Sequence, residues 1–136
     1  MQKFFFFILL LCGCYLQAQE IGHVKKGKHL LKLVKTDPYF ELVYSDMSSK
    51  EVYTEKSFKF LDKEKVFRII MDGFLYKKDH QVVVWSDQKD TVVKFNFKKI
   101  KGEVLVYLNH NNLEKKVIGL SSFFNKDQIA ELFGNP

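Results

Sequence analysis

The chain has few cysteines, and both lie close to its start. Cys12 and Cys14 are the two cysteines among 136 residues. Small exported domains often depend on disulfides for their stability. A disulfide framework is therefore excluded for the stretch after position 14, and its stability has to come from an apolar core.

Arginine is also scarce. Arg68 is the only arginine, although the chain has 22 Lys+Arg against 16 Asp+Glu and a formal net charge of +6. Proteins that read nucleic acids specifically favour arginine, because its planar fork forms paired hydrogen bonds with bases and phosphates. The lysine-rich composition instead indicates solvated strand faces, and it predicts no specific nucleic-acid partner.

The one long apolar run, at residues 4–16, follows Lys3 at the start of the chain. A helix needs about 20 residues to cross a bilayer, so this run is too short to span one. Its length and its basic flank are typical of a secretory signal peptide. We expect a signal peptide at 1–18, a polar linker at 19–29 and a single domain at 30–136, exported to the periplasm or the medium.

Two ways of processing this segment stay open. Cleavage after Ala18 suits a peptidase that admits small residues there, and the Gln-Ala-Gln-Glu stretch at 17–20 resembles exported proteins of Bacteroidota-type bacteria. Alternatively, Leu-Cys-Gly-Cys at 11–14 resembles the bacterial lipobox, although cysteine replaces the usual Ala or Ser at its second position. That resemblance implies that Cys14 becomes a lipidated first residue and that the protein is an outer-membrane lipoprotein.

Alternating apolar and polar residues indicate strands in the rest of the chain. The expected strands are 30–35, 39–44, 52–60, 80–85, 91–98, 104–108 and 115–120. Polar turns separate them, including Asp37-Pro38 and the stretch at 109–112. Short strands joined by short turns are typical of an antiparallel meander.

Two segments have helical spacing instead. Apolar residues recur every three to four positions at 62–73, with Asp62 as the expected N-cap and Gly73 as the expected left-handed stop. Asn125 and Gln128 form a capping-box pair before the second helix. We therefore expect an α+β fold, in which one antiparallel β-meander sheet of about six to seven strands has one central helix and one C-terminal helix.

No stretch has a recognisable catalytic or metal-binding pattern. The run at 22–29 has the spacing of a phosphate-binding P-loop, but no Ser or Thr follows its lysine and no helix is expected after it. The histidines His23, His29, His80 and His110 lie in linker or turn contexts without the convergence that zinc requires. We predict no catalytic residue, no cofactor and no metal ligand.

The strand at 80–85 is apolar on both faces, which is typical of a strand covered on both sides. If the helices cover one face only, the other is open to a ligand or partner. The candidate face consists of Trp85 and Val83 together with Tyr39 and Val43, which point away from the apolar side of their strand. The alternative is that helices or a loop cover it.

The function expected from these features is a small, exported, non-enzymatic binding or structural domain of the bacterial cell envelope. Its partner would be an unknown envelope protein or a small apolar ligand. Membrane contact is expected only if Cys14 is lipidated. An envelope hydrolase with an unmarked site is a further alternative.

Overall fold

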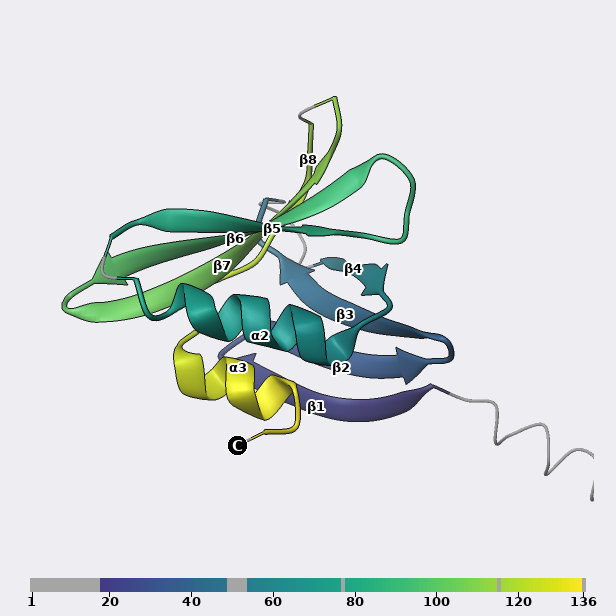
Figure 1. The fold of residues 1–136 in the computed structure, drawn as a ribbon, viewed down its shortest axis with the longest axis horizontal. Helices are drawn as coiled ribbons and strands as arrows, with labels where there is room; N and C mark the ends of the chain where they lie inside the picture. Colours follow the sequence, from purple (N-terminus) through teal and green to yellow (C-terminus); the bar gives the residue numbers. More distant parts are fainter. Residues whose placement is uncertain (1–17, 49–53, 77, 115, 136) are drawn as a thin grey trace, which may run out of the picture.

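The structure, a computed structural model, describes residues 18–48, 54–76, 78–114 and 116–135. The described strands form two antiparallel sheets of four strands each (Figure 1). The first sheet contains β1 (Gln19–Lys26), β2 (His29–Thr36), β3 (Tyr39–Asp46) and β4 (Thr54–Phe60), in that order. The second contains β5 (His80–Trp85), β6 (Thr91–Ile100), β7 (Glu103–Asn112) and β8 (Val117–Leu120), also in order. Helix α2 (Lys63–Gly73) connects the sheets, and α3 (Lys126–Leu132) follows β8.

The described part of the chain is therefore mostly β with two helices, in keeping with an α+β fold, and its strands do not form the expected single sheet of six to seven strands. Both sheets are meanders, and the chain leaves the first one through α2 before it starts the second. Each sheet has one apolar face, and two such faces bury each other when the sheets separate and pack together. Strand periodicity cannot distinguish this arrangement from one continuous meander.

Residues 19–26, expected to belong to a polar linker, form β1 instead. This strand pairs with β2 from Gln19 to Lys26, and a turn with Gly27 at φ +62° joins the two. Only one face of β1 meets the core, where Val24 is buried and Ile21 packs against the cluster. The polar residues lie on the solvent face, which explains why the stretch looks like a linker in sequence.

The turn expected at 109–112 is also absent, because β7 continues through Asn112 and pairs with β6 as far as Thr91. His110, expected in a turn, is consequently a buried residue of the inner strand face. The Asp37-Pro38 turn is found between β2 and β3.

Both helix starts agree with the sequence prediction. The Asp62 side chain accepts a hydrogen bond from Lys65 N, and Asn125 forms a complete capping box with Gln128. Gly134 has a φ of +76° after α3, as a helix stop requires. Gly73 is not a left-handed stop, since it is the last residue of α2 and its backbone faces the Phe97 ring.

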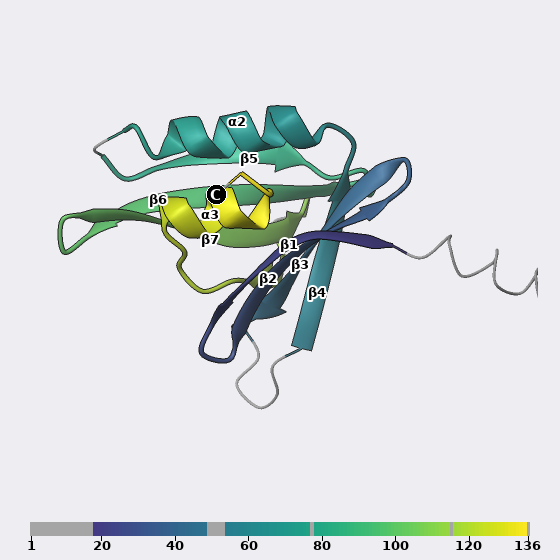
Figure 2. The ribbon, with the colours of Figure 1, turned by 90° about the horizontal axis from the view of Figure 1, so that it is seen from below.

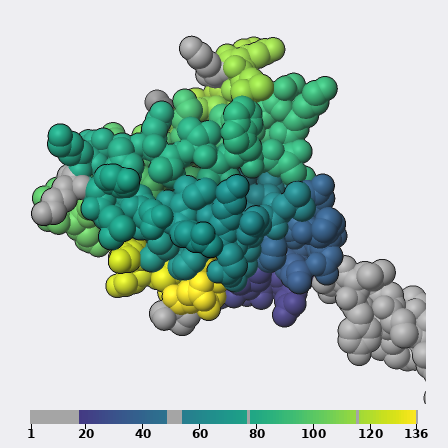
Figure 3. All heavy atoms as spheres, in the orientation of Figure 1, coloured from purple at the N-terminus to yellow at the C-terminus, as the bar shows by residue number. Residues whose placement is uncertain are grey.

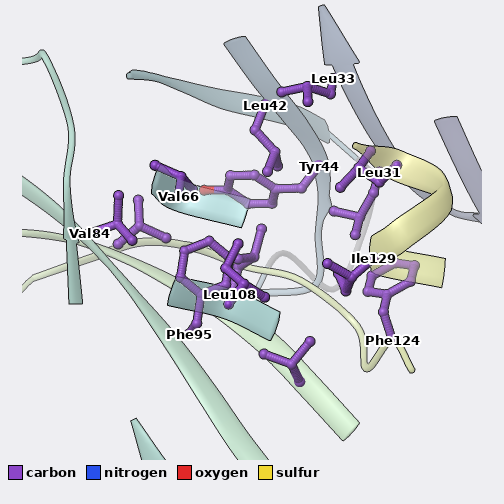
Figure 4. Packing of buried hydrophobic residues seen from close by; sticks show 14 of the residues in the cluster. Leu31, Leu33, Leu42, Tyr44, Val66, Val84, Phe95, Leu108, Phe124 and Ile129 are labelled. Atoms are coloured by element: carbon purple, nitrogen blue, oxygen red, sulfur yellow. The ribbon is translucent and has the colours of Figure 1, made fainter. Parts of the chain in front are cut away.

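One apolar core joins the two sheets and the two helices. Leu31, Leu42 and Tyr44 of the first sheet point toward Phe95 and Leu108 of the second (Figure 4). Figure 2 shows α2 running along β5, and the surface view in Figure 3 shows α3 next to β1 on this helical side of the molecule. The helices close the core where the sheets diverge. Their buried residues are Val66 and Ile70 of α2, and Ile129, Leu132 and Phe133 at α3.

Candidate functional site

The four residues of the predicted face lie on two different sheets. Tyr39 and Val43 are half-buried on the outer face of the first sheet, where Val43 lies between Lys32 and Ser57 in the strand register. Trp85 and Val83 belong to β5 of the second sheet. The structure therefore does not bring the four together, and the part of the prediction around Tyr39 meets a polar, solvated surface.

Trp85 and Val83 lie on an open face. Trp85 is 66% exposed and Val83 is 44% exposed, whereas the neighbouring Val84 is buried. Both helices and the first sheet lie on the other side of β5–β7, below these strands in the view of Figure 1. Around Trp85 and Val83, no helix or strand among the described residues lies over the outer face of the second sheet.

The strand register orders the residues of this outer face into rows. One row contains Trp85, Val92, Asn111 and Val117; the next contains Val83, Lys94, Asn109 and Leu120; a third contains Gln81, Asn96 and Tyr107. Side chains alternate between faces along a strand, so these are the outward partners of the buried Val93, Phe95 and Leu108. The face combines exposed aromatic and apolar groups with amides and lysines.

A hollow of about 550 Å³ lies where this face meets the turn between β1 and β2. We call it the basic pocket. Its lining includes Lys26, Met47, Lys98, Tyr107, Leu120 and Phe123. The volume is in the range of small-molecule sites, and the mixture of apolar walls with a few polar groups is typical of them.

The sheet positions the groups of the basic pocket. Lys98 and Tyr107 point outward from β6 and β7, and the Lys98 Nζ lies 5.7 Å from the centroid of the Tyr107 ring. Phe123 meets the same ring edge to face at 5.0 Å between centroids. The segment carrying Phe123 is held against β7 by the paired hydrogen bonds of Phe124 and Val106, at 2.8 and 2.9 Å. Lys26 Nζ reaches the Phe123 carbonyl oxygen at 3.4 Å.

The lining contains two lysines and a histidine and no carboxylate. Lysine side chains expose an ammonium group at the end of an apolar stem, so they can hold an anion while the stem covers apolar surface. The basic pocket is therefore suited to a ligand with an apolar body and an anionic group. Sequence reasoning missed it because its lysines belong to strands 72 positions apart, Lys26 and Lys98.

A second polar group of residues lies inside the protein. We call Asp46, Lys56, Tyr44 and His110 the buried polar cluster. Lys56 Nζ forms an ion pair with Asp46 Oδ2 at 2.7 Å and also donates to the Ile118 carbonyl oxygen. The Tyr44 hydroxyl lies 2.9 Å from His110 Nδ1, and Gly119 leaves room for it because a Cβ there would overlap the phenol.

Asp46 joins the first sheet to β8. Its Oδ1 accepts from Leu120 N at 3.0 Å and from the backbone N and Oγ of Ser48 at 2.9 and 2.7 Å. The backbone N of Met47 donates to the Leu120 carbonyl oxygen. A single carboxylate thus satisfies donors from β8, from Ser48 just after β3 and from Lys56.

The environment shifts the pKa of three groups in this cluster. Burial opposes ionisation of Asp46, but the hydrogen bonds from Lys56, Leu120 N and Ser48 outweigh it and hold the pKa of the carboxyl well below its usual range. Burial, and then the charge of Asp46, raise the pKa of the Tyr44 phenol above its ordinary value. Burial, and then the charge of Lys56, lower the pKa of His110. At neutral pH the cluster therefore holds one ion pair, a neutral phenol and a neutral imidazole.

This cluster contains the residue types of an acid–base site, but it is closed to substrates. Asp46 and Tyr44 are 0% exposed and His110 is 2% exposed. Catalytic groups have to reach the reacting atoms, so we interpret the cluster as a structural connection. The sequence signal that could have located His110 is the alternation Val106, Leu108, His110 on the core face of β7.

The other expectations on chemistry concern histidines and the P-loop-like run. Within the described ranges no group of three or more His, Cys, Asp or Glu side chains could hold a metal ion. His23 lies 3.5 Å from Glu20, and His80 stacks on Phe97. The run at 22–29 forms the β1–β2 hairpin, so a strand follows its glycine where a P-loop has a helix.

Comparisons with protein-family models, with curated proteins and with solved structures find no match for this chain. Among the described residues, no helix is long and apolar enough to cross a membrane. The signal-peptide and Cys14 predictions concern residues outside the described ranges.

Proposed function

We propose that the protein is a non-enzymatic binding domain that holds a small amphiphilic anion in the basic pocket, in the exported compartment indicated by its N-terminal segment. The observation that carries the proposal is the meeting of two lysine ammonium groups and two aromatic rings, Tyr107 and Phe123, in one hollow. A carboxylate or sulfonate with an aromatic or medium-length alkyl body has the matching chemistry.

Two features support binding over catalysis. The described residues of the pocket lining include one histidine, His29, and no carboxylate that could orient it as a general base, whereas the carboxylate with the perturbed pKa, Asp46, is enclosed in the core. Aromatic walls and lysine stems bury an apolar body, and the ammonium groups give it an orientation. The hydrolase alternative finds no comparable support among the described residues.

The proposal is tested with anilinonaphthalene sulfonate, a dye with an aromatic body and one sulfonate, and with dodecanoate as its competitor. We expect saturable dye fluorescence that dodecanoate displaces. Lys98→Gln should weaken binding about tenfold, the effect of losing one charge-assisted contact.

Lys99→Gln is the matched control. It removes the same charge from the adjacent position, where the exposed Lys99 lies on the opposite face of β6 and outside the pocket. The control should bind the dye like the wild type. Equal affinity of both variants, or dye binding that does not saturate, would contradict the proposal.

A further inference from the structure

A second hollow lies beside the basic pocket on the outer face of the second sheet. Its volume is about 410 Å³, and we call it the amide hollow. Along β7, Tyr107 lines the basic pocket, and the next two outward residues, Asn109 and Asn111, line the amide hollow. The lining of the amide hollow also includes Val92, Lys94 and Val117.

The amide hollow lies at the end of the sheet where β6 starts and β7 ends. Asn112 Oδ1 accepts from Lys116 N at 2.9 Å, and Leu113 N donates to the Asp90 carbonyl oxygen at 2.8 Å. These bonds hold the connection after β7 against the turn before β6. As a result Val92 and Asn111, although on the outer face, are 8% and 7% exposed.

Two side-chain oxygens of the described residues that line this hollow have no donor from the protein. Within the described part of the chain, the buried side-chain oxygens Oδ1 of Asn109 and Asn111 have no hydrogen-bond partner. Buried polar groups are almost always paired, because leaving one unpaired loses its hydration without compensation. Two such oxygens two residues apart on one strand suit an external donor, which reaches them when the two amide side chains turn toward the hollow that they line.

A hydroxyl group meets this requirement. It donates one hydrogen bond to an amide oxygen and accepts others, for which the ammonium of Lys94 and the amide nitrogens are available donors. Adjacent hydroxyls on one rigid ring can satisfy neighbouring amides together. The uncharged amides give no reason to expect a strongly charged ligand here.

Trp85 provides an aromatic surface next to these hydroxyl-binding amides. It shares a strand row with Val92 and Asn111, so it stands two strand spacings from Asn111, about 10 Å across the sheet. Its 66% exposed indole offers an apolar face beside the polar hollow. A sugar has the complementary form, with a C–H face that packs on an aromatic ring and hydroxyls around its edge.

We propose that the outer face of the second sheet binds carbohydrate, with ring hydroxyls in the amide hollow at Asn109 and Asn111 and a further sugar ring on Trp85. The distance between these groups corresponds to a ligand of two or more sugar units. This site lies beside the basic pocket and does not depend on the occupancy of that pocket.

The test titrates the purified protein with maltose, cellobiose and diacetylchitobiose. Trp85 is the only tryptophan, so a sugar packed on it changes the intrinsic emission, and calorimetry gives the affinity. We expect at least one disaccharide to bind with a Kd of about 1 mM or tighter. Asn111→Leu should weaken that binding about tenfold or more, because it removes a ligand hydrogen bond.

Asn96→Leu is the matched control, since Asn96 faces outward from the same sheet but lies outside the amide hollow. It should bind like the wild type. Asn111→Leu also removes an unpaired buried oxygen, so its melting temperature should not fall below that of the wild type. Asn109→Leu provides a second variant of the same kind.

Three results would overturn the inference: no disaccharide binds, the sugar binds equally well to Asn111→Leu and Asn96→Leu, or binding leaves the Trp85 emission unchanged. The dye assay on the same samples reports the basic pocket separately. Loss of sugar binding in Asn111→Leu with unchanged dye affinity assigns the sugar to the amide hollow.

Discussion

At the scale of single residues, Asp46 has the largest structural role in the buried polar cluster. It is the one buried carboxylate among the described residues, and it contacts Lys56, Ser48 and the backbone of Leu120. Removing one partner of a buried ion pair is strongly destabilising, because the other charge is left without compensation. Lys56 retains partial solvent access, with 36% of its side chain exposed, which moderates that penalty.

Asp46→Asn should therefore lower the free energy of unfolding by about 3 kcal/mol at neutral pH. Urea denaturation followed by far-UV circular dichroism measures this. Asp87→Asn is the matched control, because Asp87 is an exposed residue of the turn between β5 and β6; its effect should stay within about 0.5 kcal/mol. Similar losses in the two variants would show that Asp46 has no special role.

The pKa shifts also predict how stability depends on pH. The pKa of Asp46 is lower in the folded protein than its ordinary value of 3.8, so its contribution is fully present above that value and is lost as pH falls toward the folded pKa. The pKa of His110 is likewise lowered, from 6.5, because the folded core favours the neutral ring. Stability should consequently fall in two stages on acidification, the first starting below the ordinary histidine value.

Urea midpoints measured from about pH 7.5 down to about pH 3 separate the stages. Asp46→Asn should retain the first stage and lose most of the second, so the stability difference from wild type shrinks in acid. A constant difference across this range would contradict the assignment of the second stage to Asp46.

At the scale of elements, α2 is attached to the second sheet by a close approach at its last turn. Gly73 is buried against the Phe97 ring, and Phe74 meets the same ring edge to face at 5.1 Å. A Cβ at position 73 would overlap Phe97. The glycine is thus required by packing, whereas its helical backbone is available to any residue.

Gly73→Ala should destabilise the protein by about 2 kcal/mol through overpacking, although alanine is favoured over glycine in helices by about 1 kcal/mol. Thermal denaturation measures the loss. In a Phe97→Leu background the same substitution should cost less, because the smaller side chain leaves room for the Cβ. Equal costs in both backgrounds would show that the ring contact is unimportant.

At the scale of the whole molecule, the position of β1 bears on how the chain is attached or released. The first strand begins at Gln19, directly after the expected cleavage position. A chain cleaved after Ala18 keeps β1 complete. A chain lipidated at Cys14 would have only four residues between the acylated cysteine and the first strand, so the folded part would be held close to the bilayer.

We expect the protein recovered from cells that produce it naturally to have the mass of residues 19–136 and to lie in the soluble fraction. Intact-mass spectrometry combined with cell fractionation tests this. A mass that includes acyl chains on Cys14, in a membrane fraction from which Cys14→Ser is released, would establish the lipoprotein alternative instead.

Much of the local structure could be predicted from the sequence. The caps at Asp62 and Asn125, the strand at 80–85 and the alternation in 91–98 follow from interactions between residues near each other in the chain. Whether the outer face at Trp85 is covered was left open by the sequence, because it depends on where the helices and the first sheet pack. Capping and strand alternation depend on spacings of two to four residues, and such spacings are visible in the sequence.

The tertiary structure alone decided which distant residues meet. Tyr44 and His110, 66 positions apart, share a hydrogen bond, and Lys26 contacts the carbonyl of Phe123 across 97 positions. The division into two sheets, and the meeting of Asn111 and Lys94 in one hollow, also depend on how distant parts of the chain pack together. The periodicity of a strand determines which face is apolar, but the partner of that face depends on how two sheets and two helices bury their apolar surfaces together.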